Sequence, residues 1–343
     1  MMPTPPARPG RLQAIAQDQR GFALLAVTLV LAILGVVVTE FAYSMRLQAG
    51  MVRAYKDRLL GQHLAEAGVQ QAIREIMTEA TVHGIDEDGQ VIFYRLLAGT
   101  TAPQRVPPLE RTRVPLGAGE FSYRITDEER RVNLNASQPD RIDKLLLAIG
   151  IDKDVRDKIS DSLLDWRDAD DNYRTNGAES DDYYLNLPVP YRARNGNLQD
   201  VAELLQIKGV TPEIYYGNGE RPGLAELVTV RGSGAININT APPPVLSAAG
   251  LSEAEIALAV ERRVNNPKTA PPSSRGATRF TVRSTVFRIE AEGLIAGQPK
   301  ARVIAIVQRG GSGGSAPTAM VYSWRPVPTR AEPAPAPKAG ASR

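Results

Sequence analysis

The sequence predicts an α+β fold in which one long N-terminal helix packs on an antiparallel sheet and a large helical segment is inserted into that sheet. An uncharged run at 22–38 leads into a helical apolar pattern that continues to about residue 77. Residues 119–126 and 285–291 alternate between apolar and polar side chains, as strands with one buried face do, and a turn at 296–299 leads into a further strand at 301–307. Between 130 and 270 the apolar spacing becomes helical, so this stretch forms the insertion.

Composition narrows the class of protein. The 343 residues are 43% hydrophobic and 23% charged, which is typical of a chain that folds into a packed body. The net charge of +3 is too small to indicate a nucleic-acid partner. The chain has no cysteine and only two histidines, His63 and His83, which excludes disulfides and disfavours thiolate, histidine-based metal and catalytic-triad sites.

The N-terminal segment predicts a single membrane span. Residues 1–20 are polar and basic, and residues 22–38 then carry no charge before Glu40. Seventeen helical residues rise about 26 Å, the lower limit for crossing a bilayer core. By the positive-inside rule the basic leader stays in the cytoplasm. The body is therefore expected on the periplasmic side of the inner membrane.

The junction at Gly21 and Phe22 distinguishes two kinds of leader. An ordinary signal peptide has an apolar core of about 7–15 residues and a small-residue cleavage site, and neither feature is present here. A short basic leader that ends in Gly21, directly before an apolar helix beginning with Phe22, is typical of a prepilin leader. Cleavage is then expected between these two residues.

The helix continues beyond the membrane. Residues 22–77 contain no proline, and their second half repeats apolar side chains at the i, i+3, i+4, i+7 spacing. The stripe consists of Val69, Ala72, Ile73, Ile76 and Met77. A continuous helix of this length would extend about 85 Å. We expect its first half in lipid and its second half against a sheet.

The expected elements of the body follow from periodicity. The expected strands are 91–95, 119–126, 285–291, 301–307 and 320–325, and the expected helices are 139–149, 153–168, 198–206, 222–229, 242–249 and 252–264. Val132-Asn-Leu-Asn135 resembles Ile236-Asn-Ile-Asn239, and each precedes a helix that ends at a glycine. This internal similarity indicates two duplicated helical halves.

These patterns divide the chain into six parts. They are a leader (1–21), the membrane half of the helix (22–38), the first part of the sheet domain (39–129), the inserted all-helical domain (130–270), the completion of the sheet (271–325) and a disordered tail (326–343). The glycine- and serine-rich stretch 310–315 is expected to be a flexible linker.

An acidic loop is the candidate metal site. Seven carboxylates occur within 18 residues, and Asp168, Asp170, Asn172 and Glu179 stand at relative positions 1, 3, 5 and 12. That is the oxygen-ligand spacing of an EF-hand calcium loop, although Tyr173 replaces the glycine expected at position 6. The alternative is a solvated acidic loop that is partly balanced by neighbouring arginines. The full set of expected calcium ligands is Asp168, Asp170, Asn172, Glu179, Asp181 and Asp182.

A set of motifs in fixed order resembles one family. They are the leader junction, Asp127–Asn135, Leu164–Asp171, Asn176–Glu179, Pro190–Asn195, Ile207–Thr211 and Ile236–Pro242. Together they resemble the general secretion pathway protein K family, the minor pseudopilins of the type II secretion system, from about residue 18 to 307. The resemblance implies a pilin-like domain that carries an inserted helical domain of SAM or helix-hairpin-helix type. Because family members bind calcium in this region, it also favours a structural calcium ion.

The same resemblance implies processing, place and partners. A prepilin peptidase would cut before Phe22 and methylate its new amine. The subunit would sit at the tip of the pseudopilus with minor pseudopilins I and J, with minor pseudopilin H and the major pseudopilin G as further candidate partners. Pilins usually carry Glu at the fifth residue after cleavage, but here that residue is Ala26. A tip subunit has no neighbour above it, so an apolar residue avoids an unpaired carboxylate in lipid.

The predicted function is therefore a structural subunit that supports protein export, with no catalytic residues. A different class remains open, namely a membrane-anchored, calcium-dependent periplasmic hydrolase or binding domain with an uncleaved anchor. No nucleophile motif such as Gly-x-Ser-x-Gly supports it. The turn Glu203–Val210 resembles a helix-hairpin-helix, but a periplasmic location argues against DNA and favours a plain interhelical turn.

Overall fold

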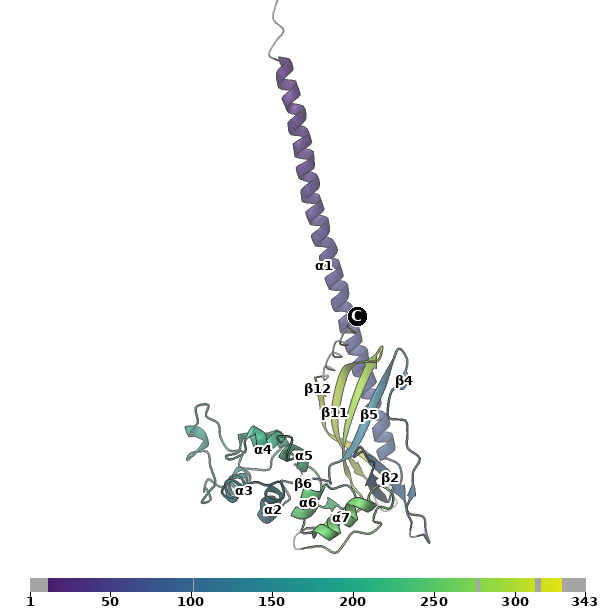
Figure 1. Ribbon diagram of the computed structural model, residues 1–343, viewed down its shortest axis with the longest axis vertical. Helices are drawn as coiled ribbons and strands as arrows, with labels where there is room; N and C mark the ends of the chain where they lie inside the picture. The colour runs from purple at the N-terminus through teal and green to yellow at the C-terminus, as the bar shows by residue number, and fades with distance from the viewer. Residues whose placement is uncertain (1–11, 101, 276–277, 312–315, 329–343) are drawn as a thin grey trace, which may run out of the picture. The chain divides into compact units, whose positions relative to one another are not determined.

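The computed structural model describes residues 12–100, 102–275, 278–311 and 316–328, and it divides into two compact units at Leu59 and Leu60. The first unit is the N-terminal part of helix α1 (Leu12–Ile76), drawn in purple in Figure 1. The helix ends where the sequence predicted but begins ten residues before Phe22. Of the expected leader (1–21), residues 1–11 lie outside the described residues.

The first unit carries no packed core of its own. Its large apolar side chains are exposed along the whole apolar run. The hydroxyls of Thr28 and Thr39 donate hydrogen bonds to carbonyls one turn earlier, those of Leu25 (2.9 Å) and Gly35 (2.7 Å). Polar side chains that are satisfied within the helix lower the cost of placing it in lipid.

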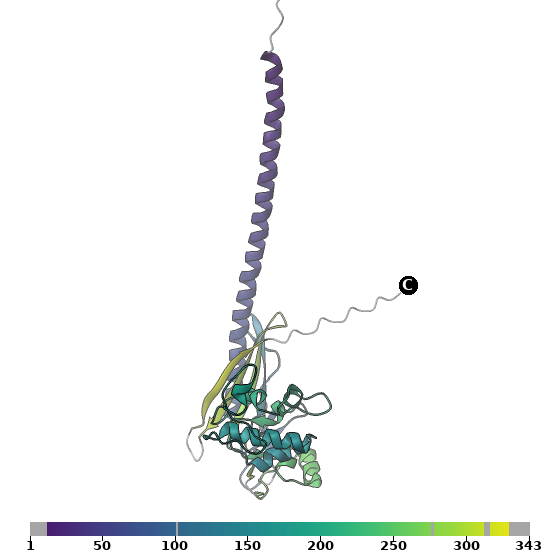
Figure 2. The ribbon, with the colours of Figure 1, turned by 90° about the vertical axis from the view of Figure 1, so that its left-hand side faces the viewer.

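The second unit is built on a five-stranded antiparallel sheet of order β12-β11-β10-β5-β4. Its strands are β4 (Val114–Leu116), β5 (Gly119–Asp127), β10 (Val286–Ile295), β11 (Gln298–Gly310) and β12 (Thr318–Val327). The β10–β11 hairpin turns at Ala296 and Gly297, whose φ angles of 51° and 74° are those of a two-residue hairpin turn. Figure 2 shows β11 and β12, in yellow, running side by side. The predicted hairpin and edge strand are both present.

Residues 60–76 of α1 cover one face of this sheet. The apolar stripe of the helix joins inward side chains of β5, β10 and β11 in one buried cluster. The helix approaches closely because glycines lie at the crossing: a Cβ on Gly293 would stand 1.9 Å from the carbonyl oxygen of Gly61. A Cβ on Gly68 would meet Ala291 and Phe121 at 3.2 Å. The close packing of the helix on the sheet therefore depends on glycines, which have no side chain, as much as on apolar side chains.

A second, smaller sheet was only partly foreseen. It contains β1 (Val82–Ile85), β2 (Val91–Arg95) and β3 (Gln104–Arg105) in antiparallel order. Only β2 was predicted. Strand β1 is buried at every position, so it lacks the alternation by which half-buried strands are recognised.

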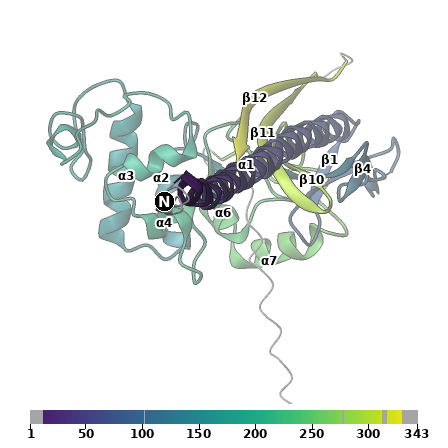
Figure 3. The ribbon, with the colours of Figure 1, turned by 90° about the horizontal axis from the view of Figure 1, so that it is seen from above.

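Helices are the main regular structure of the segment between β5 and β10. It contains α2 (Pro139–Ala148), α3 (Lys153–Arg167), η1 (Tyr184–Asn186), η2 (Val201–Gln206), α4 (Pro212–Tyr216), α5 (Leu224–Leu227), α6 (Pro243–Ala248) and α7 (Glu253–Arg262). Four strands of two residues each also occur there: β6 (Val132–Asn133) pairs with β7 (Val228–Thr229), and β8 (Ile236–Asn237) with β9 (Phe280–Thr281), both in parallel. The all-helical expectation omitted these strands, and the helix expected at 198–206 is a 3₁₀ helix. Figure 3 shows α2, α3 and α4 in teal beside the strands of the large sheet.

The two similar motifs adopt the same structure. The side chain of Asn135 accepts a hydrogen bond from the backbone nitrogen of Leu198 (2.9 Å) and donates one to its carbonyl (2.9 Å). Asn239 makes the same pair with Lys268, at 2.8 and 3.0 Å. Each motif leads into a helix, α2 or α6, that ends at a glycine with positive φ. The two motifs thus share a local structure, and the duplication of the helical halves stays a prediction.

Candidate functional site: the anchor helix and the acidic loop

The predicted processing junction lies inside a continuous helix. Gly21 and Phe22 are both exposed, and a Cβ on Gly21 would meet no other atom within 4 Å. Ala26, the fifth residue counted from Phe22, follows it by about one turn of the helix. Helix α1 is long and apolar enough to cross a membrane.

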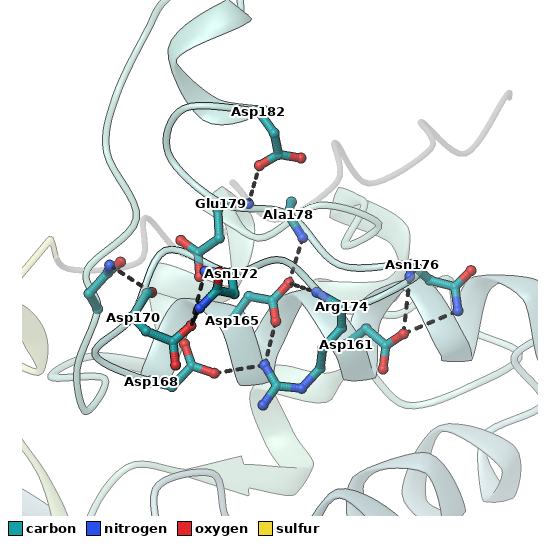
Figure 4. A network of polar contacts seen from close by, with 11 residues as sticks. Asp161, Asp165, Asp168, Asp170, Asn172, Arg174, Asn176, Ala178, Glu179 and Asp182 are labelled. Atoms are coloured by element: carbon teal, nitrogen blue, oxygen red, sulfur yellow. Dashed lines mark hydrogen bonds and ion pairs between the residues drawn. The ribbon is translucent and has the colours of Figure 1, made fainter.

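Helix α3 holds the acidic loop from one side (Figure 4). Asp165, fully buried, accepts hydrogen bonds from the backbone nitrogens of Arg174 (3.1 Å) and Ala178 (2.9 Å). One turn earlier, Asp161 accepts from the backbone and side-chain nitrogens of Asn176 at 3.2 and 3.1 Å. A Cβ on Gly177 would stand 1.8 Å from an oxygen of Asp165, so the loop lies directly on the helix.

Arg174 neutralises part of the loop. Its guanidinium pairs with Asp165 and, at 2.7 Å, with Asp168, the C-cap residue directly after α3. Such ion pairs are what the interpretation as a solvated acidic loop, with its charge partly balanced by arginines, requires. They involve two of the seven carboxylates and leave the centre of the loop uncompensated.

Glu179 is that uncompensated centre. Its residue is 1% exposed, and neither carboxylate oxygen has a hydrogen-bond partner among the described residues. Burial, followed by repulsion from Asp165 and Asp168, raises the pKa of Glu179 to about 7. Oxygen Oδ1 of Asp168 and Oδ1 of Asn195 are likewise buried without a partner. A buried, unpaired carboxylate is costly unless a cation or a proton compensates it.

The other expected ligands differ in how they are used. Asp170 caps the turn by accepting from the backbone and side chain of Asn172, at 3.0 and 2.9 Å. Asp182 accepts from the backbone nitrogen of Glu179 (2.7 Å), and Figure 4 shows it on the other side of the loop from Asp168. The side chain of Asp181 is 81% exposed, at 3.9 Å from Arg192.

The unpartnered oxygens of the loop are of the type that a hard cation binds, but their side chains do not converge on one point. The unpartnered atoms of Glu179, Asp168 and Asn195 are carboxylate or amide oxygens, the ligands that calcium prefers. Within the described residues, however, no three acidic or histidine side chains converge as a ready metal site. Sequence reasoning missed Asn195, whose amide donates to the carbonyl of Asp170 (3.3 Å) and to the side chain of Asp171 (3.0 Å). The motif Pro190–Asn195 was its only signal.

A serine, a histidine and an aspartate meet elsewhere, but they do not form a catalytic site. Ser284 donates its hydroxyl to Asp127 (2.5 Å) and its backbone N–H to the Nδ1 of His83 (2.9 Å). The histidine therefore does not contact the hydroxyl, and burial lowers its pKa to about 3. All three residues are at most 1% exposed. The cluster instead ties the end of β5 to the start of β10.

Comparison with known proteins agrees with this architecture. The family described as type II secretion system (T2SS), protein K, matches residues 124–217. The chain is 30% identical to type II secretion system protein K of Pseudomonas aeruginosa over 68% of both chains. It is 32% identical to that of Pectobacterium carotovorum over 57% of this chain, spanning 60% of the relative.

A solved structure shows the same fold. It is the crystal structure of the GspK-GspI-GspJ complex from the type 2 secretion system of enterotoxigenic Escherichia coli. The match has a TM-score of 0.55 at 18% identity and covers 83% of this chain and 99% of the other. With the Pseudomonas relative matched over more than two thirds of its length, the chain belongs to the type II secretion system protein K family.

Proposed function

We propose that this protein is a minor pseudopilin at the tip of the periplasmic pseudopilus, where it supports the export of folded proteins across the outer membrane. The observation that carries this is helix α1, whose membrane-length apolar run leads without a break into a stripe packed on an antiparallel sheet. One helix thus joins an anchor to a folded head. Its basic leader supports a topology with the N-terminus in the cytoplasm and the folded domain in the periplasm.

Processing follows from the same helix. We propose that a prepilin peptidase cuts between Gly21 and Phe22 and methylates Phe22. The apolar Ala26 supports a tip position, because a subunit with no neighbour above it has no amine to neutralise. The proposed partners are the minor pseudopilins I and J, because the solved structure with the same fold is a complex of GspK with GspI and GspJ. Pseudopilins H and G are further candidates.

The role we propose is structural rather than catalytic. The one serine–histidine–aspartate cluster noted above is buried and wrongly connected for nucleophilic catalysis. We propose that the segment between β5 and β10 is the inserted domain of SAM or helix-hairpin-helix type. The similar hydrogen bonds of Asn135 and Asn239 support this proposal. The exposed surface of this segment is available to partners or exported proteins.

We also propose a structural calcium ion in the acidic loop. Glu179, Asp168 and Asn195 would hold it through their unpartnered oxygens, and Asp170, Asn172, Asp181 and Asp182 complete the expected set. Binding would require the loop to draw these side chains together. A bound divalent cation would remove the repulsion around Glu179 and fix the loop on α3.

A secretion assay tests the function. The host strain without this chain should lose export, and the wild-type chain should restore it. The variant Gly21→Val should fail because a β-branched residue replaces the glycine at the cut. Gly50→Val is the matched control, since it is another helical glycine with no atom within 4 Å. Export that is independent of the chain, or restored by Gly21→Val, would contradict the proposal.

A further inference from the structure

Strand β12 leaves part of the sheet uncovered. Its register pairs Val321 with Val307 and Trp324 with Ala305, so the paired side chains share one face of the sheet. Val307 and Ala305 lie in the buried cluster beneath α1, whereas Val321 is 44% and Trp324 38% exposed. Ala319 and Pro326 lie on the same face. We call these four residues of β12 the uncovered inner face.

The opposite face of the strand is already engaged. Arg325 pairs with Asp200 at 2.6 Å, and the guanidinium of Arg231 lies 5.6 Å above the ring of Tyr322. These contacts join β12 to the segment between β5 and β10. The strand is therefore held in place, and its inner face is exposed on a fixed element.

The free edge of β12 is protected against another strand. Pro326 lies within the strand, Pro317 and Pro328 flank it, and a bulge at Tyr322 interrupts the pairing with β11. Proline removes a backbone donor and bulges twist an edge, both of which discourage strand addition. The side chains of the inner face, rather than the backbone edge, are thus the available surface.

Arg309 gives this face a charge preference. It pairs with Ala319 across the sheet and is 7% exposed. Its Nε and Nη1 have no hydrogen-bond partner among the described residues. Glu79 attracts this guanidinium and Arg283 repels it. Because two of its buried nitrogens still lack an acceptor, the site favours an incoming acid.

We propose that the uncovered inner face docks the extramembrane half of a partner pseudopilin's N-terminal helix, one with an apolar stripe and an acidic residue directed at Arg309. The inference rests on the proposed function. The surface is continuous with the one that α1 covers over β5, β10 and β11, so the complementary element is again a helix with small and apolar residues. The partner helix would lie beside α1 and complete the cover of the sheet.

Binding to pseudopilins I and J tests the proposal. Full-length protein in detergent is titrated with the I and J subunits of the same system. The double variant Val321→Ala, Trp324→Ala should weaken binding at least tenfold, because both apolar contacts are lost. Met320→Ala is the matched control: Met320 is an exposed apolar residue of the same strand, pairs with Gln308 and lies on the opposite face. It should change binding less than twofold.

A second variant adds bulk instead of removing contacts. Ala319→Arg places a second cation beside Arg309 on the inner face, whereas Thr318→Arg, one residue earlier, points to the other face. Ala319→Arg should abolish binding and Thr318→Arg should not. The fluorescence of Trp324 is obtained by subtracting the emission spectrum of Trp324→Phe from that of wild type, which removes the signal of the buried Trp166. This difference spectrum should shift to shorter wavelength when I and J bind.

The outcomes separate the two proposals. Equal binding by wild type, the double variant and Ala319→Arg would overturn the docking surface and leave the tip function intact. A wild-type chain that binds neither I nor J would overturn both. Loss of binding with Met320→Ala as large as with the double variant would also contradict the inner face as the contact.

Discussion

At the scale of single residues, two carboxylates of the acidic loop have opposite environments. Asp165 is buried but accepts hydrogen bonds from two backbone nitrogens and pairs with Arg174. Glu179 is equally buried and has no partner within the described chain. The first carboxylate fastens the loop, while the second makes the loop depend on a proton or a cation.

Glu179 predicts a pH dependence of stability in the presence of chelator. The unfolded chain releases this proton near pH 4.5 and the folded chain near 7. Between these values the folded state holds the extra proton, so the free energy of unfolding falls as pH rises and levels off above 7. The contribution is up to about 3 kcal/mol. Denaturant titrations from pH 4.5 to 8 should show the fall in wild type and in Asp181→Asn. In Glu179→Gln the fall should be smaller but not absent, because burial also raises the pKa of Glu129 to about 7.

Calcium should reverse the effect of the same substitution. In chelator at pH 7.5, Glu179→Gln should raise the melting temperature because it removes an unpaired buried charge. In calcium it should lower it relative to wild type, because a charged ligand is lost. Differential scanning fluorimetry in both conditions measures this reversal. A wild-type melting temperature that does not respond to calcium would refute the cation site.

At the scale of elements, the packing of α1 on the sheet depends on glycines at the crossing. A Cβ on Gly61 would lie 2.6 Å from the Cβ of Lys300, and Gly293 faces the carbonyl of Gly61 from the strand. Gly50, in the same helix, has nothing within 4 Å. Close packing therefore requires a glycine at position 61 of the helix, whereas no packing contact requires one at position 50.

Substitution at these positions should separate packing from helix propensity. Gly61→Ala should destabilise the second unit by about 1–3 kcal/mol because the crossing is overpacked. Gly50→Ala should be neutral or stabilising by up to about 1 kcal/mol, since alanine favours helix. Chemical denaturation of the detergent-solubilised chain measures both. Equal, small effects would show that the helix does not approach the sheet this closely.

The similar hydrogen bonds of Asn135 and Asn239 predict similar losses of stability when either residue is replaced. Asn135→Ala and Asn239→Ala each remove a side chain that makes two hydrogen bonds to one backbone residue and leave those groups unpaired. Asn135 also donates to the carbonyl of Val230 (3.1 Å). Each substitution should cost about 2–4 kcal/mol in the free energy of unfolding. Asn218, which accepts two backbone bonds in an exposed turn, is the control and should cost less than about 1 kcal/mol when changed to alanine. Markedly unequal losses at 135 and 239 would contradict an equivalent role.

The sequence foresaw the elements whose pattern is local. Strand β5 alternates, α1 carries its stripe, and α7 begins at the capping box of Ser252 and Glu255 that the structure retains. Strands β3 and β4 have two and three residues, too few to show a period. The sequence showed that the loop is rich in aspartate and glutamate. That Glu179 is buried and Asp181 exposed depends on how α3 holds the loop, which no spacing reveals.

At the scale of the whole molecule, one chain combines a membrane anchor with a head that has open surfaces. The anchor is the exposed apolar helix of the first unit, and the head is the sheet with its inserted segment. Both features suit a subunit that is extracted from a membrane into an assembly through helix contacts. The proposed role depends on α1 being a processed pseudopilin helix rather than a permanent anchor.

The most direct test is the intact mass of the membrane-extracted protein, made with and without an active prepilin peptidase. A processed pseudopilin should lose residues 1–21 and gain one methyl group on Phe22, only when the peptidase is present. An uncut chain in both samples, with a control pilin cleaved in the same cells, would contradict the proposed role.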